Sequence, residues 1–318
     1  MATDIARRDF LKGGAALGGL VATSALPTFA DDPSVFPQRG RFERLSLQFF
    51  EIKAGATKPF TVLHISDTHL TAAYDDETER IRQIAKNRTR TFGGRQEEAL
   101  RDSIAWAKTH CDYLVHTGDM IDMVSKANLD LVKKYFGEGG DVMLGCLGNH
   151  EYYYGQGKGP EPEEKKKALR DALAGAFPFK LSLSSSVLNG VNFVMLDNAS
   201  DTISAEQATL FEAEVKKGLP IILGMHCPFA TYNIVRAARR FWRFDGKLKY
   251  IPDMRTFNEK FRDKMTTDFV AYLRAQPLLK AILCGHGHIG VVDPFSPTAT
   301  QYEVSGNFMF HGQEFTIT

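Results

Sequence analysis

Short apolar runs recur along the chain, and most of them stop abruptly at polar residues. The runs that predict buried strands cover residues 60–66, 112–117, 141–147, 219–225 and 279–284. A continuous apolar run of this length, bounded by turn residues, is typical of a strand buried on both faces. Residues 191–197 predict a core strand without polar ligands, and weak alternation over 45–50 predicts an edge strand.

Helical spacing of apolar residues appears between these runs. It predicts helices over 97–108, 126–136 and 204–217, and another that ends near Ala174. The charged stretch 71–90 predicts a mobile loop or a short helix, and alternation after Ala299 predicts closing antiparallel strands. The chain has 318 residues and shows no repeat or convincing linker, so we expect a single α/β domain after the N-terminal segment.

Polar residues with metal-binding side chains follow five of the predicted strands. Asp67 and His69 stand at i and i+2 on an extended segment, so their side chains point the same way. The glycine of Gly118-Asp119 permits a sharp turn after a buried strand, where open α/β sheets place their ligands. The complete set is Asp67, His69, Asp119, Asn149, His226, His286 and His288.

These seven residues are too many for one tetrahedral ion. They suffice for two ions that share a carboxylate and keep positions open for water and substrate. Carboxylate, imidazole and amide oxygen in this ratio favour Mn, Fe or Zn over Ca or Cu. The sequence therefore predicts two divalent metal ions as cofactors.

Composition and charge exclude several other classes of protein. The formal net charge is +1, and removal of the first 30 residues, with three basic and two acidic side chains, brings it near zero. Bulk electrostatics thus give no reason to expect nucleic-acid or membrane-surface binding. The four cysteines are scattered singly, so neither a zinc ribbon nor a disulfide framework is indicated.

The N-terminus has the features of an export signal. Residues 6–12, ARRDFLK, resemble the twin-arginine motif, a mildly apolar run follows to about Leu26, and Ala30 ends a small-residue cleavage site. We therefore expect a signal peptide over 1–30, a mature domain over 31–318, and a periplasmic or extracellular protein. Its partner would be the twin-arginine export machinery, which is known for carrying folded proteins. The apolar run is too short and glycine-rich to span a bilayer comfortably, and cleavage or retention as an anchor both remain open.

The ordered motifs DTH, GDMID, GNHE, GMH and GHGH resemble the five blocks of the calcineurin-like metallophosphoesterase superfamily, from Asp67 to His288. The resemblance implies an α/β fold, a two-layer β-sandwich flanked by α-helices, with a dinuclear metal site at the strand ends. Asp67, His69 and His288 would hold one metal, and Asn149, His226 and His286 the other. Asp119 would bridge the two.

The same resemblance implies how such a protein would hydrolyse a phosphate ester. A hydroxide between the two cations would attack phosphorus without a covalent protein intermediate, and no GxSxG motif is present. His150 would contact the phosphoryl oxygen or act as the general acid, with Asp122 orienting it and keeping it charged. The alternative for Asp122 is an ordinary helix N-cap.

Two differences from known members of the superfamily narrow the choice of subfamily. Purple acid phosphatases carry a tyrosine after the GD motif, whereas Met120-Ile121-Asp122 stands here, which argues against a ferric site. Bacterial 5′-nucleotidases of this superfamily carry a large additional substrate domain, whereas 30 residues follow His288, too few for that domain.

The segment 228–262 is basic and aromatic, with Arg236, Arg239, Arg240 and Trp242 among its residues. It could be a lid that binds a base and a phosphate, or a solvated helix face anchored by aromatic side chains, and the second interpretation is favoured. The tyrosines 152–154 could line the same pocket.

Three functions are compatible with these motifs. The first is an exported phosphoesterase that acts on a small-molecule or cell-envelope phosphate ester. The second is a phosphodiesterase or nuclease, against which the neutral overall charge argues. The third is a non-catalytic metal- or envelope-binding protein, against which the intact pair of His150 and Asp122 argues.

Overall fold

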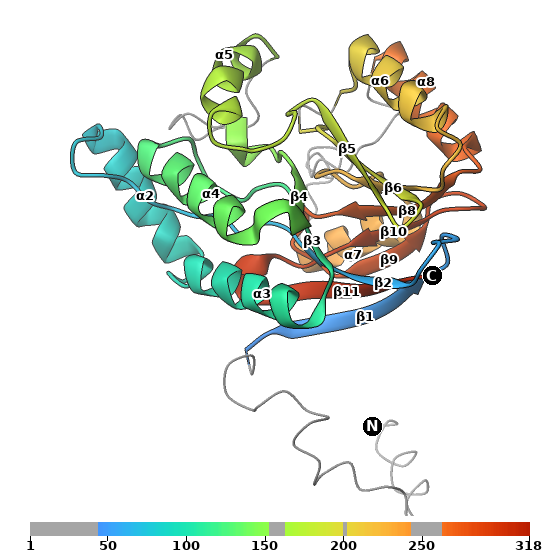
Figure 1. Cartoon of the computed structure of the whole chain (residues 1–318). Helices are drawn as coiled ribbons and strands as arrows, with labels where there is room; N and C mark the ends of the chain where they lie inside the picture. Colours follow the sequence, from blue (N-terminus) through green and yellow to red (C-terminus); the bar gives the residue numbers. More distant parts are fainter. Residues whose placement is uncertain (1–43, 153–162, 200–201, 243–262) are drawn as a thin grey trace, which may run out of the picture. The chain divides into compact units, whose positions relative to one another are not determined.

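Two mixed β-sheets form the centre of the computed structural model, which describes residues 44–152, 163–199, 202–242 and 263–318. These residues belong to one compact unit that spans Phe42–Thr318. The first sheet has five strands in the order β1-β11-β2-β3-β4 (Figure 1). They are β1 (Ser46–Ile52), β11 (His311–Ile317), β2 (Phe60–Ile65), β3 (Tyr113–Thr117) and β4 (Met143–Cys146). Strands β2, β3 and β4 run parallel, so their carboxyl ends meet at one edge.

The second sheet has six strands in the order β5-β6-β7-β8-β10-β9. They are β5 (Leu183–Leu188), β6 (Val191–Leu196), β7 (Ile221–Gly224), β8 (Leu279–Cys284), β10 (Thr300–Glu303) and β9 (Val291–Pro294). Strands β6, β7, β8 and β10 are parallel, and the outer strands β5 and β9 are antiparallel to their neighbours.

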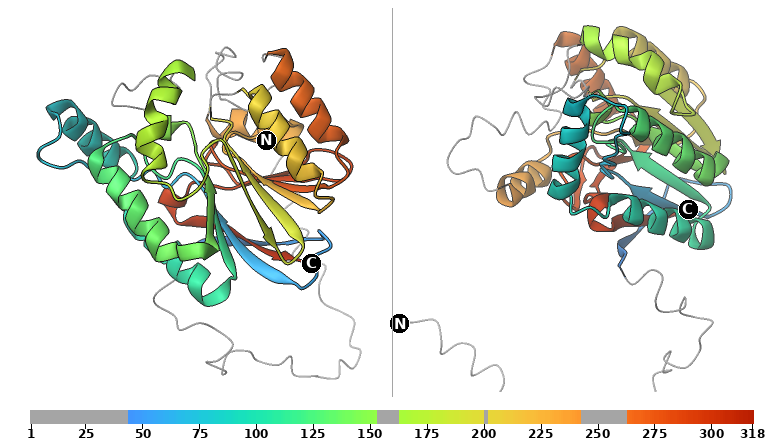
Figure 2. Two further views of the ribbon diagram at one scale, coloured as in Figure 1. Left: turned by 45° about the horizontal axis from the view of Figure 1, so that its top comes forward. Right: turned by 90° about the vertical axis from the view of Figure 1, so that its left-hand side faces the viewer.

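Helices cover the outer face of each sheet. The left view of Figure 2 shows α4 on one side of the two sheets and α6 and α8 on the other. The helices are α2 (Glu79–Thr91), α3 (Gln96–His110), α4 (Lys126–Gly139), α5 (Glu163–Ala174), α6 (Ala205–Val215), α7 (Tyr232–Phe241) and α8 (Lys264–Ala275). Short 3₁₀ turns occur at η2 (Gly140–Val142), η3 (His150–Tyr152) and η6 (Asn307–Met309).

The buried apolar residues form three main layers. One packs the first sheet against α3, α4 and α5, and another packs the second sheet against α6 and α8. The third lies between the sheets, where Val62 and Val115 of the first sheet share a cluster with Phe193 and Ile222 of the second. The expected two-layer sandwich flanked by helices is thereby confirmed.

Two buried histidines that are not candidate ligands predict an acid-sensitive fold. Burial lowers the pKa of His64 to about 3 and that of His116 to about 4. Both are neutral when folded, whereas in the unfolded chain they take up protons below about pH 6.5. Their contribution to stability is therefore complete above pH 6.5 and is lost as the pH falls towards 4 and 3.

This effect can be isolated with His64→Gln. Each such group steepens the loss of unfolding free energy by about 1.4 kcal/mol per pH unit within that window. The unfolding free energy, measured by denaturant titration at several pH values between 6 and 4, should fall less steeply with decreasing pH in the variant, by about this amount. Equal slopes for wild type and variant would contradict the assignment.

Candidate metal centre

Five of the seven candidate ligands stand on left-handed backbone shortly after the strands, so Asp67 and His69 do not lie on the extended segment that the sequence predicted. Seven described non-glycine residues have positive φ, and five of them are Asp67, His69, Asp119, His286 and His288, with φ of 52° to 73°. Such conformations cost about 1–3 kcal/mol each and persist where the surrounding structure fixes them, commonly at functional sites. Backbone hydrogen bonds supply that fixation, because the Asp67 amide donates to the Gly118 carbonyl and the His69 amide to the Asp119 carbonyl.

Gly118 permits the close approach of two of these loops. Its φ is +91°, and an added Cβ would lie 2.6 Å from the Gly148 amide nitrogen and 2.9 Å from His226 Nδ1. Gly55 offers a matched comparison, because it has φ of +82° with nothing within 4 Å of the added atom.

We expect Gly118→Ala to cost more stability than Gly55→Ala. Both variants place an L-residue in the left-handed region, which costs about 1–2 kcal/mol. Only Gly118→Ala adds overpacking, which costs about 1–3 kcal/mol more and displaces His226. Chemical denaturation of the two variants with chelator present measures the difference in unfolding free energy. Equal losses of unfolding free energy would show that the loops around Gly118 move apart without cost.

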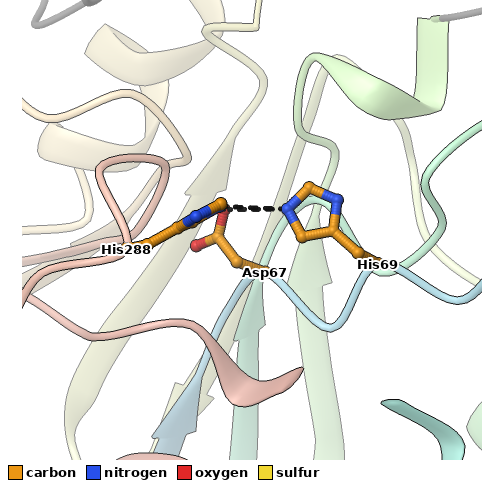
Figure 3. A group of neighbouring side chains, drawn as sticks. All are labelled: Asp67, His69 and His288. Atoms are coloured by element: carbon orange, nitrogen blue, oxygen red, sulfur yellow. Dashed lines mark hydrogen bonds and ion pairs between the residues drawn. The ribbon is translucent and has the colours of Figure 1, made fainter. Parts of the chain in front are cut away.

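The first group of candidate ligands is Asp67, His69 and His288, whose side chains turn towards one another in Figure 3. Asp67 follows β2, and His288 comes from the loop after β8. The Nε2 atoms of His69 and His288 are 3.0 Å apart, and Asp67 Oδ1 is 3.2 Å from His288 Nε2 and 3.8 Å from His69 Nε2. Three ligand atoms at these separations can face one cation.

The second group is Asp119, His226 and His286. His226 Nε2 lies 3.2 Å from Asp119 Oδ2 and 3.1 Å from His286 Nδ1. Asn149 Oδ1 lies 3.1 Å from the same His226 nitrogen. The structure thus brings all seven predicted ligands to one edge of the sheets.

Asp119 lies between the two groups. Its Oδ2 is 3.8 Å from His69 Nε2, and a third triad consists of His69, Asp119 and His150. This placement is what a carboxylate shared by two cations requires.

The negative charge of the buried carboxylates in the cluster is compatible with bound cations. Asp67 Oδ1 is buried and accepts no hydrogen bond from the described part of the chain. Burial by itself lowers the pKa of His226, but the carboxylates of Asp119 and Asp67 raise it to about 10. The carboxylates therefore attract positive charge strongly, and the donor set of imidazole, carboxylate and amide oxygen suits transition metals or zinc.

Hydrogen bonds to the far ring nitrogens orient two candidate ligands. His69 Nδ1 donates to Asp122 Oδ1 at 3.0 Å, and His226 Nδ1 donates to the Thr117 carbonyl at 2.8 Å. A protonated Nδ1 leaves Nε2 facing the cluster as the coordinating atom, which is the usual arrangement around metal-binding histidines.

His150 lies at the rim of the cluster, with 17% of its side chain exposed. Its Nδ1 is 3.0 Å from Asp122 Oδ1 and 2.9 Å from the Asp122 carbonyl. Burial alone would lower the pKa of His150, but the charge of Asp119 and the hydrogen bond to Asp122 raise it. Asp122 therefore contacts the predicted acid, and it also contacts His69, a contact that the sequence did not predict.

Three further residues support the site and were missed in the sequence. The buried carboxylate of Glu151 accepts hydrogen bonds from the backbone amides of Asp119, Ile121 and Gly148 at 3.0, 3.1 and 2.6 Å. The Asn198 side chain accepts from the His226 amide at 3.1 Å. Arg88 binds Asp122. Glu151 follows the GNH motif and Asn198 follows the predicted strand 191–197, so both could have been singled out, whereas Arg88 carries no local signal.

The structure corrects part of what the sequence predicted for the tyrosines 152–154 and for the basic segment 228–262. Tyr152 is 2% exposed and donates to Asp197 Oδ2 at 2.6 Å, so it belongs to the core and does not line a pocket. The three arginines of α7 are exposed, as the solvated-helix interpretation expects. The expected aromatic anchor is wrong for Phe241, which is 52% exposed, and the buried residues Ile234 and Ala238 anchor the helix. Trp242 Nε1 donates to the Gly287 carbonyl at 3.1 Å, beside His288. Tyr153, Tyr154 and the basic residues beyond Trp242 in this segment lie outside the described residues.

Two sheets flanked by helices, with buried histidine and aspartate clusters after the strands, define a metallophosphoesterase-like fold with a candidate dimetal site. Residues 60–290 match the family model described as calcineurin-like phosphoesterase. The chain therefore belongs to that family. The comparison with curated proteins gave no match.

Solved structures resemble the chain only distantly. A dimetal phosphatase from Danio rerio is 14% identical, with a TM-score of 0.46 over 79% of this chain and 88% of that one. A putative 5′-nucleotidase from Staphylococcus aureus is 13% identical, with a TM-score of 0.43 over 79% of this chain and 49% of that one. A 5′-nucleotidase from Candida albicans is 14% identical, with a TM-score of 0.38 over 81% and 48%. Scores this low give no argument about function.

Residues 4–24 match the model of the twin-arginine translocation signal sequence. The protein is therefore exported by that route, as the sequence predicted. Among the described helices, none has the length and apolar character needed to cross a membrane.

Proposed function

We propose that the protein is an exported, metal-dependent phosphoric ester hydrolase that acts on a small-molecule or cell-envelope phosphate ester. One observation carries this proposal. The carboxylate of Asp119 lies between two groups of candidate ligands, and a histidine held by Asp122 stands at their rim. A site built only to bind metal has no need of that histidine.

Asp67, His69 and His288 would hold one divalent ion, and Asn149, His226 and His286 the other, with Asp119 shared between them. The donor set ranks Mn, Fe and Zn first. When bound, two such ions supply Lewis-acid stabilisation of a phosphoryl group and a water of lowered pKa. The loops on left-handed backbone hold the side chains in place before substrate arrives.

His150 would donate a proton to the leaving oxygen of the ester. Its Nδ1 is directed at Asp122, so Nε2 is the atom left for the substrate. The charge of Asp119 and the hydrogen bond to Asp122 raise the pKa of the ring, which favours the protonated state that a general acid needs. Bound cations would oppose this effect, and Asp122 would then be needed to keep the imidazolium stable.

The test is hydrolysis by the purified mature chain with Mn, Fe or Zn supplied. The substrates are p-nitrophenyl phosphate and bis-p-nitrophenyl phosphate. Metal-dependent turnover of the monoester supports the proposal, and a preference for the diester would move it to a phosphodiesterase. If protein that holds two metal ions hydrolyses neither ester, the hydrolase proposal fails for these substrate classes.

A further inference from the structure

Arg88 reaches the site from helix α2, 34 residues before the carboxylate that it binds. Its Nε donates to Asp122 Oδ2 at 2.6 Å, and a terminal nitrogen donates to Asp122 Oδ1 at 2.8 Å. The Asp122 side chain is 2% exposed and that of Arg88 is 35% exposed. Two parallel charge-assisted bonds of this kind fix the plane of a carboxylate as well as stabilising its charge.

The fixed carboxylate serves two imidazoles at once. Asp122 Oδ1 is 3.0 Å from both His69 Nδ1 and His150 Nδ1. If the carboxylate rotated about its Cβ–Cγ bond, that oxygen would leave both rings together. The orientation of a candidate ligand and of the proposed acid therefore depends on one torsion angle, which the guanidinium holds.

A second contact runs from the same end of α2 to His69. The Arg88 guanidinium lies 4.8 Å from the centre of the Phe92 ring. Phe92, the residue that ends the helix, stacks on the His69 ring at 4.3 Å with an interplanar angle of 11°. The helix thus holds His69 at its ring face as well as through Asp122.

We propose that Arg88 is a positioning residue for the dimetal site. It holds Asp122 so that the Nε2 atoms of His69 and His150 both face the ligand cluster. The part that concerns His150 rests on the proposed hydrolase function, whereas the part that concerns His69 rests on metal binding alone.

The first experiment measures metal binding and needs no turnover. Metal-free wild type, Arg88→Ala and Arg88→Lys are titrated with Mn²⁺ or Zn²⁺ by calorimetry. We expect Arg88→Ala to weaken one of two bound equivalents by about 10–100-fold and to leave the other unchanged, since only the group with His69 loses its support. A lysine cannot form the two-pronged contact, so Arg88→Lys should recover only part of the loss.

Arg82→Ala is the matched control. Arg82 lies on the same helix and pairs with Glu79, away from Asp122. We expect it to bind both equivalents like wild type. If Arg88→Ala weakens both equivalents equally, or neither, the positioning role is wrong.

The second experiment is kinetic, at saturating metal. We expect kcat of Arg88→Ala to fall about 10–100-fold with KM changed by no more than about two-fold, as for groups that act only in the transition state. The loss should be larger for phenyl phosphate than for p-nitrophenyl phosphate, because the poorer leaving group depends more on the proton from His150. Added guanidinium ion should restore part of the activity of Arg88→Ala.

A uniform loss on both esters without rescue would overturn the action of Arg88 through His150. If wild type hydrolyses neither ester, the proposed hydrolase function fails, while the titrations still decide whether Arg88 supports His69.

Discussion

Replacing Asp119 by Asn should abolish metal-dependent hydrolysis and weaken the binding of both metal equivalents. Asp119 is the carboxylate that lies within reach of His69 in one group and of His226 in the other. Its second oxygen accepts the His150 amide at 2.8 Å, so it also fixes the loop that carries the proposed acid. An amide removes a full negative charge from between the two groups. A loss of about 4 kcal/mol of charge stabilisation corresponds to about a 10³-fold fall in rate.

The control for this variant is Asp268→Asn on α8. Asp268 is exposed and pairs with Lys264 one helical turn away, so its loss should leave activity and metal content unchanged. Metal content by atomic emission and kcat/KM on the same preparations give both readouts. Were Asp119→Asn to retain two tightly bound ions, Asp119 would not be the shared ligand, whatever its effect on rate.

A metal-free measurement separates the electrostatic role of Asp119 from catalysis. The pKa of His226, about 10, owes its rise chiefly to Asp119. In metal-free Asp119→Asn the pKa of His226 should therefore fall, because burial lowers it and its strongest partner is gone. Proton NMR titration of the histidine signals follows this change.

The parts of the fold that the sequence predicted well are those with unbroken apolar runs. Strands β2, β3, β4, β6, β7 and β8 begin and end within two residues of their predicted bounds. Strand β5 was not predicted, because its sequence LSSSVL is serine-rich and half exposed at the edge of a sheet. Helix α2 buries only Ile81 and Ala85, which is why its pattern did not distinguish a loop from a helix. Helix α7 was expected only as a solvated helix face without bounds inside 228–262, and α8 was missed because the residues after that segment were not assigned.

The ligand residues were predictable for a different reason. Each one lies two to four residues after the end of a strand. Parallel topology brings the ligands of each sheet to the carboxyl ends of its strands, and the packing of the two sheets brings those ends together. Asn198 also follows a strand, β6, but residues 191–197 were interpreted as a core strand without ligands. Arg88 comes from a helix that no local motif ties to the site, and its contact exists only once the chain has folded. Asp122 was predicted to serve His150 alone, and its contact with His69 depends on the path of the β2 loop, where the Asp122 amide donates to the Leu70 carbonyl.

The function of His150 is open to a test that distinguishes an acid from a ligand. His150 belongs to a triad with His69 and Asp119, so its position alone would also allow it to bind a metal ion. Its hydrogen bond through Nδ1 to Asp122 orients Nε2 in either case. We expect His150→Gln to retain both metal equivalents and to lose about 10²–10⁴-fold in kcat, the usual contribution of a general acid.

The dependence on leaving group completes this prediction. A proton donor matters most when the departing oxygen is a poor leaving group, so His150→Gln should lose more activity on phenyl phosphate than on p-nitrophenyl phosphate. His110→Gln, on α3 beside Trp106, is the control histidine and should match wild type on both esters. Loss of one metal equivalent together with an equal fall on both esters would instead make His150 a ligand. In that case Asp122 would orient two coordinating histidines, and the proton for the leaving group would have to come from water.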